Sequence, residues 1–227
     1  MKKFNLSLLF FVALSFGMAQ CTVGQSKSKE SVRYVLIETE YGNMKVKLYN
    51  ETPQHRDNFL KLVEQGYYDG LLFHRVIKQF MIQGGDPNSR ETPAGTMLGD
   101  GNLGYTIPAE FRTELFHRKG ALAAARLGDN VNPRKESSAC QFYIVQGNVW
   151  KRDQLQMMEQ RFGKQFSQEQ MDVYSTEGGA PHLDGEYTVF GEVVEGLEVI
   201  DAIAQLPTDR ADRPKEDVRM KISIIEQ

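Results

Sequence analysis

The sequence predicts a single, mainly β domain built from antiparallel strands with a few helices. Apolar and polar residues alternate in Arg33–Tyr49 and again in Val218–Ile224, and such alternation is typical of strands with one buried face. The predicted elements begin with a hairpin, a helix and a strand pair. This order contains no repeating βαβ unit, which argues against a doubly wound parallel sheet. The length of 227 residues suits one domain with short additions.

The first 20 residues are typical of a secretory signal peptide and are expected to lie outside the fold. A basic start, Met1–Lys3, precedes the apolar stretch Leu6–Phe16, which is too short to span a bilayer comfortably. Cys21 follows and resembles the lipid-attachment cysteine of bacterial lipoproteins, although Gln20 stands where a small residue is usual. We expect export to the periplasm, either with a lipid on Cys21 or after ordinary cleavage. Residues 21–32 are polar and predict a flexible tether.

The main domain is predicted to span residues 33–226 and to begin with a hairpin. The two strands lie in Arg33–Tyr49, around a turn at Tyr41-Gly42-Asn43. Thr52-Pro53 then predicts the start of a helix, because Thr can cap the first turn and Pro lacks an N–H that would have no partner there. Gly66 is placed to end this helix.

The stretch Leu72–Asp86 is the most informative part of the chain. Two apolar runs of strand length meet near Lys78-Gln79 and stop at Gly84-Gly85, which predicts a strand pair. Arg75 and Gln83 lie within these runs, and burying either side chain without a partner would cost several kcal/mol. An edge strand with one solvated face would explain them. The grouping of a guanidinium, an amide and several apolar side chains instead favours a shallow apolar pocket with polar edges.

The middle of the chain combines a glycine-containing loop with two further strands. Pro87–Tyr105 lacks the preceding strand, the following helix and the Lys-Ser/Thr pair of a phosphate-binding loop, which disfavours phosphate binding. Gly120–Arg126 predicts a strand of small side chains, which would let the backbone of a ligand lie close to the sheet. The next strand is predicted within Cys140–Val145, where Gln141 and Tyr143 share one face and Cys140 lies on the other.

The segment Asn148–Ala180 predicts a helical insertion. Apolar residues follow helical spacing in its first half, and Ser167 with Gln170 can form a capping box in its second half. We expect this insertion to pack on the rest of the domain, and a partner-binding surface is the functional alternative. A strand at Tyr187–Val194, a helix at Leu197–Leu206 and the last strand follow. The last strand can pair with the first and so close the sheet.

The run F-H-R-V-I-K-Q-F-M-I-Q-G-G-D, residues 73–86, is close to the main signature of the cyclophilin-type peptidyl-prolyl cis-trans isomerases. The chain resembles this family over residues 33–147 and 181–226, and the insertion at 148–180 departs from the minimal family pattern. The resemblance implies a closed, eight-stranded antiparallel barrel with two flanking helices, here with a helical insertion. It also implies an enzyme that rotates Xaa-Pro bonds in proline-containing polypeptides without a cofactor or metal.

The resemblance assigns roles to ten positions. Arg75 matches the arginine that donates to the prolyl nitrogen and is the expected electrostatic catalyst, while Gln83 matches the amide that bonds the substrate backbone. Tyr143 matches a position in the proline pocket where Phe is more usual. The expected catalytic residues are Arg75, Phe80 and Gln83. The expected substrate-binding residues are Met81, Ala125, Arg126, Gln141, Tyr143, Leu183 and Tyr187.

Three departures from familiar members concern the edges of the expected groove. Arg126 replaces the Asn of many eukaryotic members, His182 stands where an indole is common, and Tyr187 stands where a His is common. Because the indole N–H matters for cyclosporin binding in the family, the resemblance implies weak cyclosporin affinity. Catalysis is expected to survive, since Arg75 and the apolar pocket residues are present.

Composition and motifs argue against several other functions. The formal net charge is -3 and no basic stripe is present, so nucleic acid is not an expected partner. A cysteine hydrolase would need a His base beside Cys140, and no motif links any of the four histidines to it. Those scattered histidines also lack a close metal-ligand spacing. The main alternative is a non-catalytic proline-segment binder or holdase. We expect a monomer that meets a membrane only through a lipid on Cys21.

Overall fold

Eight antiparallel strands form the main sheet, and the structure is a computed structural model. Hydrogen bonds join the strands in the order β10-β1-β2-β9-β6-β8-β4-β3. The first hairpin, the signature stretch and the small-residue stretch all form strands as predicted. The bounds in sheet order are Lys221–Ile225, Arg33–Thr39, Gly42–Leu48, Val189–Glu195, Ala121–Ala124, Phe142–Val145, Met81–Gly84 and Arg75–Ile77. Two short strands, β5 (Thr106–Ile107) and β7 (Ser137–Ser138), form a separate pair.

The structure describes residue 1, residues 31–93 and residues 95–225. Apart from Met1, the predicted signal peptide, Cys21 and most of the predicted tether therefore lie outside the described residues. In the described part of the chain, no helix combines the length and apolar character that a membrane crossing requires.

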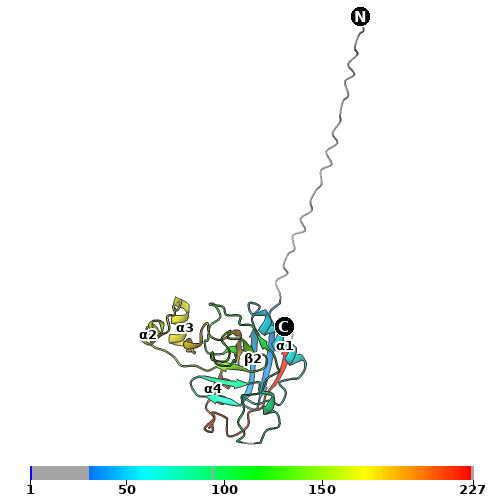
Figure 1. The fold of residues 1–227 in the computed structure, drawn as a ribbon. Coiled ribbons are helices and arrows are strands. Elements are labelled where there is room, and N and C mark those ends of the chain that lie inside the picture. Colours follow the sequence, from blue (N-terminus) through cyan, green and yellow to red (C-terminus); the bar gives the residue numbers. More distant parts are fainter. Residues whose placement is uncertain (2–30, 94, 226–227) are drawn as a thin grey trace. The chain divides into compact units, whose positions relative to one another are not determined.

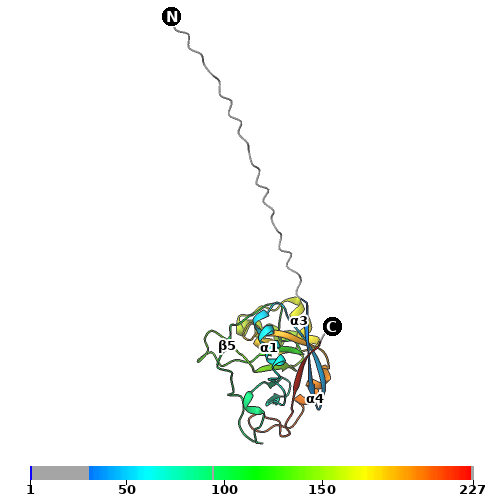
Figure 2. The same cartoon turned by 90° about the vertical axis from the view of Figure 1, so that its right-hand side faces the viewer.

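The sheet is open, so the predicted closed barrel is wrong. The last strand does pair with the first, as expected, and Figure 2 shows the red last strand beside the blue first strands. However, β10 and β3 are the two edges of the sheet. A single bridge between Leu72 and Arg219 joins the two edges, and it lies before either edge strand begins. The bridge therefore does not extend into hydrogen-bonded pairing between β3 and β10. The result is a half-barrel.

Strand alternation gives the sheet two apolar faces. The main core lies on one face and includes Val35, Ile37, Phe142 and Ile144, all at most 1% exposed. Cys140 belongs to this core, as its side of the strand predicts. A smaller cluster on the other face is built from Met81, Ala121, Ala123, Tyr143, Val145, Ala180 and Val189. This second cluster carries the candidate site.

Two helices flank the sheet as predicted. Helix α1 (Pro53–Glu64) packs against β10 and β9, and α4 (Leu197–Ala204) packs against β2, β4 and β3. Thr52 lies at the N-cap of α1, but its side chain makes no capping bond, so the predicted Thr cap is wrong. The carboxylate of Glu110 accepts bonds from the backbone N–H groups of Gln54 and His55 instead, at 3.2 and 3.0 Å. A distant carboxylate therefore fills the anion-favouring end of the helix.

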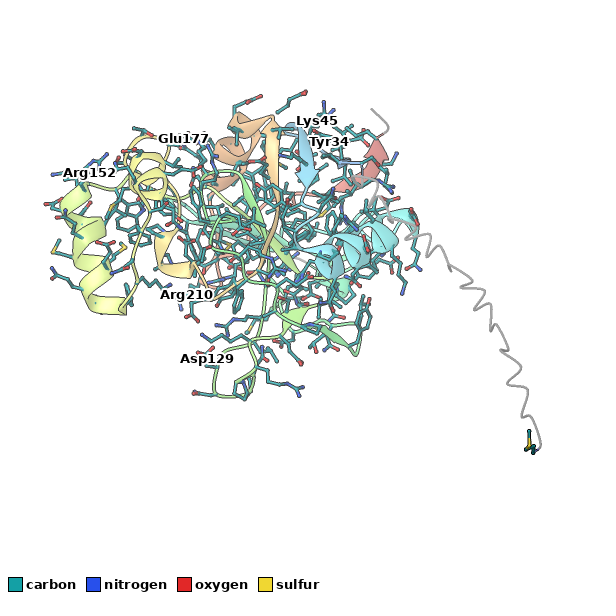
Figure 3. All side chains as sticks on the ribbon, turned by 90° about the horizontal axis from the view of Figure 1, so that it is seen from above. Tyr34, Lys45, Asp129, Arg152, Glu177 and Arg210 are labelled. Atoms are coloured by element: carbon teal, nitrogen blue, oxygen red, sulfur yellow. The ribbon has the colours of Figure 1, made fainter. Side chains whose placement is uncertain are left out.

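The insertion contains two helices, α2 (Arg152–Phe162) and α3 (Gln168–Thr176), which lie together at one edge of the domain (Figure 1). The capping box is present as predicted, because Gln170 N–H donates to Ser167 Oγ and Ser167 N–H donates to Gln170 Oε1. A small core of Phe116, Leu155 and Tyr174 joins the insertion to the rest of the domain. Figure 3 shows Arg152 on the outer side of the insertion, far from Lys45 on the first hairpin.

His74 makes stability sensitive to acid. Burial lowers the pKa of His74 from 6.5 to about 4. Between these two pH values the imidazole of the unfolded chain binds a proton, whereas that of the folded chain does not. The contribution of neutral His74 to the free energy of unfolding is therefore fully present above pH 6.5 and is lost as the pH falls toward 4. We expect the wild type to lose about 2–3 kcal/mol more than His74→Gln between pH 7.5 and 4.5, at about 1.4 kcal/mol per unit. Urea unfolding at the two pH values measures this difference, and equal losses in the two proteins would contradict it.

Candidate active site

A pocket of about 300 Å³ opens on the face of the sheet opposite the main core. Its walls come from the β3–β4 hairpin, from the two residues that follow β6, from β8, and from the segment after the insertion. The lining residues are Arg75, Phe80, Met81, Gln83, Ala125, Arg126, Tyr143, Leu183 and Tyr187. Nine of the ten predicted site residues thus meet in one pocket, and Gln141 lies just behind it.

Strand register explains how distant residues meet. Arg75 on β3 lies opposite Gln83 on β4, and Gln83 lies opposite Tyr143 on β8. Residues directly opposite one another in antiparallel strands share a face and lie about 4.5–5.5 Å apart at Cβ. The guanidinium, the amide and the phenol therefore form a row across three strands.

Arg75 lies at the open edge of the pocket, with its side chain 42% exposed. Its Nη1 lies 3.4 Å from Gln83 Oε1, and its Nε lies 3.6 Å from Asp212 Oδ2. The loop that carries Asp212 is itself tied to the strand, because Val76 N–H donates to Asp212 O at 2.8 Å. Both contacts are long, so the guanidinium keeps donors that a ligand in the pocket can use.

Gln83 is held by a buried polar network behind the pocket. Its Nε2 donates to Gln141 Oε1 at 3.0 Å, and Gln141 Nε2 donates to the carbonyls of Gly99 and Gly101, each at 2.8 Å. The buried carboxylate of Asp86 accepts from the N–H groups of the same two glycines. A Cβ on Gly101 would lie 2.0 Å from Asp86 Oδ1, so only glycine fits there. The network leaves Gln83 with one preferred orientation.

Arg126 is built into the wall of the pocket. Its side chain is only 5% exposed, and its guanidinium lies 4.5 Å from the ring centroid of Tyr187. Nε donates to Glu186 O at 2.8 Å and Nη1 donates to Asp129 Oδ1 at 2.6 Å. These partners occupy Nε and Nη1, so Arg126 is fixed in the wall of the groove, where its guanidinium packs against Tyr187. Its expected role in gripping a peptide stays a prediction.

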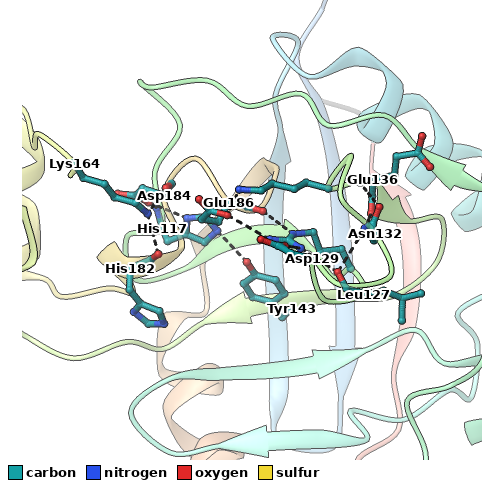
Figure 4. A network of polar contacts seen from close by, with 12 residues as sticks. His117, Leu127, Asp129, Asn132, Glu136, Tyr143, Lys164, His182, Asp184 and Glu186 are labelled. Atoms are coloured by element: carbon teal, nitrogen blue, oxygen red, sulfur yellow. Dashed lines mark hydrogen bonds and ion pairs between the residues drawn. The ribbon is translucent and has the colours of Figure 1, made fainter. Parts of the chain in front are cut away.

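The Tyr143 hydroxyl is bound below the pocket by residues that the sequence did not single out. Tyr143 Oη lies 2.9 Å from Nε2 of His117, and Nδ1 of His117 lies 2.9 Å from Asp184 Oδ1 (Figure 4). Burial raises the pKa of Tyr143 well above its usual range, so the hydroxyl keeps its proton. The only signal in the sequence was Tyr143 itself, because a buried hydroxyl needs a partner.

The structure does not support the other chemistries. Cys140 packs in the main core, and burial raises the pKa of its thiol, which disfavours a nucleophilic thiolate. Among the described residues, no three His, Cys, Asp or Glu side chains gather as metal ligands would. His74 is buried next to the start of β3 and does not line the pocket.

Comparisons with known proteins match this geometry to a family. A model of the cyclophilin-type peptidyl-prolyl cis-trans isomerases matches residues 34–224. The chain belongs to this family. The predicted enzyme class, a peptidyl-prolyl cis-trans isomerase, is thereby confirmed. The roles assigned to single site residues remain predictions.

Relatives with assigned names support the same membership. A Staphylococcus aureus protein assigned to the peptidyl-prolyl cis-trans isomerases is 36% identical over 194 residues, which cover 85% of this chain and 91% of that protein. A Streptococcus pyogenes protein assigned as a bifunctional phosphatase and isomerase is 39% identical over 188 residues. The match covers only 37% of the length of the streptococcal protein, so the similarity does not extend to the rest of that protein.

A solved cyclophilin has the same fold. The crystal structure of a Cryptosporidium parvum cyclophilin-type isomerase matches with a TM-score of 0.63 and 26% identity, covering 87% of this chain and 99% of that chain. A second crystal structure of the same protein, determined in the presence of the dipeptide Ala-Pro, matches with a TM-score of 0.61, 26% identity and coverage of 86% and 99%.

The polar network behind Gln83 gives a testable consequence for this isomerase. Gln141→Leu would leave the Gly99 and Gly101 carbonyls and the Gln83 amide without their present partner. We expect the free energy of unfolding to fall by about 1–3 kcal/mol, and KM for an Xaa-Pro peptide to rise about tenfold, because unmade buried bonds cost that much. Gln168→Leu is the control, since Gln168 is exposed and bonds only Asp172. An unchanged KM in Gln141→Leu would show that the network does not position Gln83.

Proposed function

We propose that this cyclophilin accelerates Xaa-Pro rotation during the folding of exported proteins, by a non-covalent mechanism centred on Arg75. The observation that carries the proposal is the position of a half-exposed guanidinium at the edge of an apolar pocket. The Ala-Pro dipeptide used with the Cryptosporidium relative supports proline-containing peptides as substrates.

The chemistry requires no covalent step. Cis and trans Xaa-Pro bonds differ by only about 0.5–1 kcal/mol, yet a barrier of about 18–20 kcal/mol separates them because amide resonance must be broken. At the top of the barrier the prolyl nitrogen is pyramidal and basic. A catalyst therefore needs to hold the proline ring, let the preceding carbonyl swing and donate to that nitrogen.

The pocket residues can meet these needs. Met81 and Tyr143, 2% and 4% exposed, offer a rigid apolar floor for the proline ring, with Phe80 and Leu183 beside them. Arg75 projects from the neighbouring strand toward the edge, where the prolyl nitrogen would lie. Gln83 can bond the substrate backbone, and the small side chain of Ala125 leaves room for an extended chain.

The magnitudes fit this assignment. A rate gain of about 10⁵ corresponds to roughly 7 kcal/mol of transition-state stabilisation. A preorganised charged donor aimed at the developing lone pair can supply about half of this amount. The orientation of the twisted peptide along the pocket can supply the remainder.

Replacing Arg75 tests the mechanism. We expect Arg75→Ala to lower kcat/KM for cis-to-trans exchange by about 100- to 1000-fold, because it removes a preorganised donor, while the Kd for the peptide stays within a few-fold. Arg75→Lys should be intermediate, since lysine keeps the charge without the planar fork. Arg152→Ala is the matched control, because Arg152 is also half-exposed and has an acidic partner, Asp172. The measurement is exchange of an Xaa-Pro peptide by NMR.

The same experiment separates the two competing functions. If Arg75→Ala keeps wild-type turnover, the electrostatic mechanism is wrong. If the wild type binds the peptide without accelerating exchange, the protein is a proline-segment binder or holdase.

We propose that the chain is exported through its N-terminal signal and that Cys21 carries a lipid that holds a monomeric domain at a membrane. The order of basic residues, apolar stretch and cysteine supports this proposal. In a bacterial host fed a labelled fatty acid, Cys21→Ser should abolish incorporation, whereas Cys140→Ala, which changes the other of the two cysteines, should not. Export without any label in the wild type would favour ordinary cleavage and a free periplasmic protein.

A further inference from the structure

Four side chains, each hydrogen-bonded to the next, connect the proline pocket to the insertion. Tyr174 Oη lies 2.6 Å from Asp184 Oδ2, and Asp184 Oδ1 lies 2.9 Å from His117 Nδ1. His117 Nε2 lies 2.9 Å from Tyr143 Oη, in the wall of the pocket. We call these four residues, Tyr174, Asp184, His117 and Tyr143, the tyrosine chain. It runs from helix α3 to strand β8.

Each group in the tyrosine chain has a defined role as donor or acceptor. The Asp184 carboxylate can only accept, so Tyr174 O–H and His117 Nδ1–H donate to it, and the His117 backbone N–H donates to it as well, at 2.9 Å. With Nδ1 carrying the ring proton, Nε2 of a neutral imidazole has a lone pair that accepts a hydrogen bond from the Tyr143 hydroxyl. The two hydroxyls, the carboxylate and the imidazole are therefore all paired in one arrangement, and the Tyr143 ring is held by the hydrogen bond of its hydroxyl.

The Tyr174 end of the tyrosine chain is rigidly packed. Its ring is fully buried and makes edge contacts with Phe116 and Phe166, at centroid distances of 5.4 and 5.9 Å. Gly179 passes between Tyr174 and His117, where a Cβ would lie 2.3 Å from His117 O and 2.5 Å from the Tyr174 ring. This close passage lets the insertion approach His117 directly.

A second tie joins the insertion to the segment that carries another pocket-lining residue, Leu183. Lys164, between α2 and α3, donates from Nζ to the carbonyls of His182 and Asp184, at 2.9 and 2.5 Å (Figure 4). These carbonyls flank Leu183, which lines the pocket. The insertion therefore holds both an aromatic and an aliphatic wall residue.

We propose that the insertion, residues 148–180, is a positioning element for proline binding, acting on Tyr143 through Tyr174, Asp184 and His117 and on Leu183 through Lys164. The inference rests on the proposed function in one respect, that the proline ring occupies this pocket. Arg75 reaches the pocket from β3, and its hydrogen bond and ion pair go to Gln83 and Asp212, which are not members of the tyrosine chain. Loosening the walls should therefore weaken peptide binding more than turnover.

The test compares Tyr174→Phe, Tyr143→Phe and the double variant in the full-length protein. Tyr174→Phe removes one hydroxyl and keeps the ring that packs the insertion. We expect KM for an Xaa-Pro peptide to rise about three- to tenfold in each single variant, with kcat within twofold of the wild type. In the double variant KM should rise no more than in Tyr143→Phe alone. Once Tyr143 lacks its hydroxyl, it has no hydrogen bond to His117 through which a change at Tyr174 could affect it. The proposal would be overturned if the rise in KM of the double variant equalled the product of the rises in the two single variants. An unchanged KM in the single variants would also overturn it.

Two further variants separate positioning from general damage to the fold. Thr176→Val removes a hydroxyl from the same helix that bonds only the helix carbonyls of Asp172 and Val173, and it should leave KM unchanged. Lys164→Met breaks the second tie, which ends on the backbone carbonyls of His182 and Asp184, and it leaves the side-chain bonds of the tyrosine chain in place. It should raise KM with kcat within twofold. If Tyr174→Phe does not fold, an unchanged KM in Lys164→Met still contradicts the proposal.

The outcomes also distinguish this proposal from the proposed function. If the wild type does not catalyse exchange, the proposed function fails, and the Kd for the same peptide replaces KM in every comparison. If the wild type is active and the single variants keep its KM, the positioning role alone fails. Labelled-histidine NMR adds a structural readout, since the His117 Nε2 signal should shift in Tyr174→Phe and stay in place in Thr176→Val.

Discussion

The pairing of β4 with β3 on one side and β8 on the other is the constraint on which the site depends. This register places Arg75, Gln83 and Tyr143 in one row, although they come from three strands and span 69 positions of the chain. A shift of one residue in either pairing would turn the facing side chains into the main core. The core prevents such a shift, because Ile82, Phe142 and Ile144 fill it from the opposite faces of the same strands.

Buried polar bonds then define the walls of the pocket. Gln141 and Asp86 tie two glycine backbones and the Gln83 amide together, while His117 and Asp184 hold the Tyr143 hydroxyl. An unpaired polar group in such surroundings is costly, so each network has few alternative arrangements. The pocket can thus be apolar at its floor and polar at its edges without losing its shape. Orientation of this kind is what a non-covalent catalyst of bond rotation needs.

The insertion adds to the family fold at a place where it can matter for binding. Its helices carry their own small core, and the residues that leave this core toward the sheet are polar and directed at pocket-wall residues. Apolar packing and these polar ties together connect the insertion to residues that line the pocket.

The sequence by itself determined the family, the strand pattern and all nine residues that line the pocket, because the run at residues 73–86 and period-two alternation are local properties. It did not determine the open edges of the sheet, the Glu110 cap of α1, the contact of Asp212 with Arg75 or the tyrosine chain. Each of these joins residues far apart in the sequence, and no local pattern marks a partner. Only tertiary structure decides which distant groups satisfy a buried hydroxyl, a helix end or a strand edge.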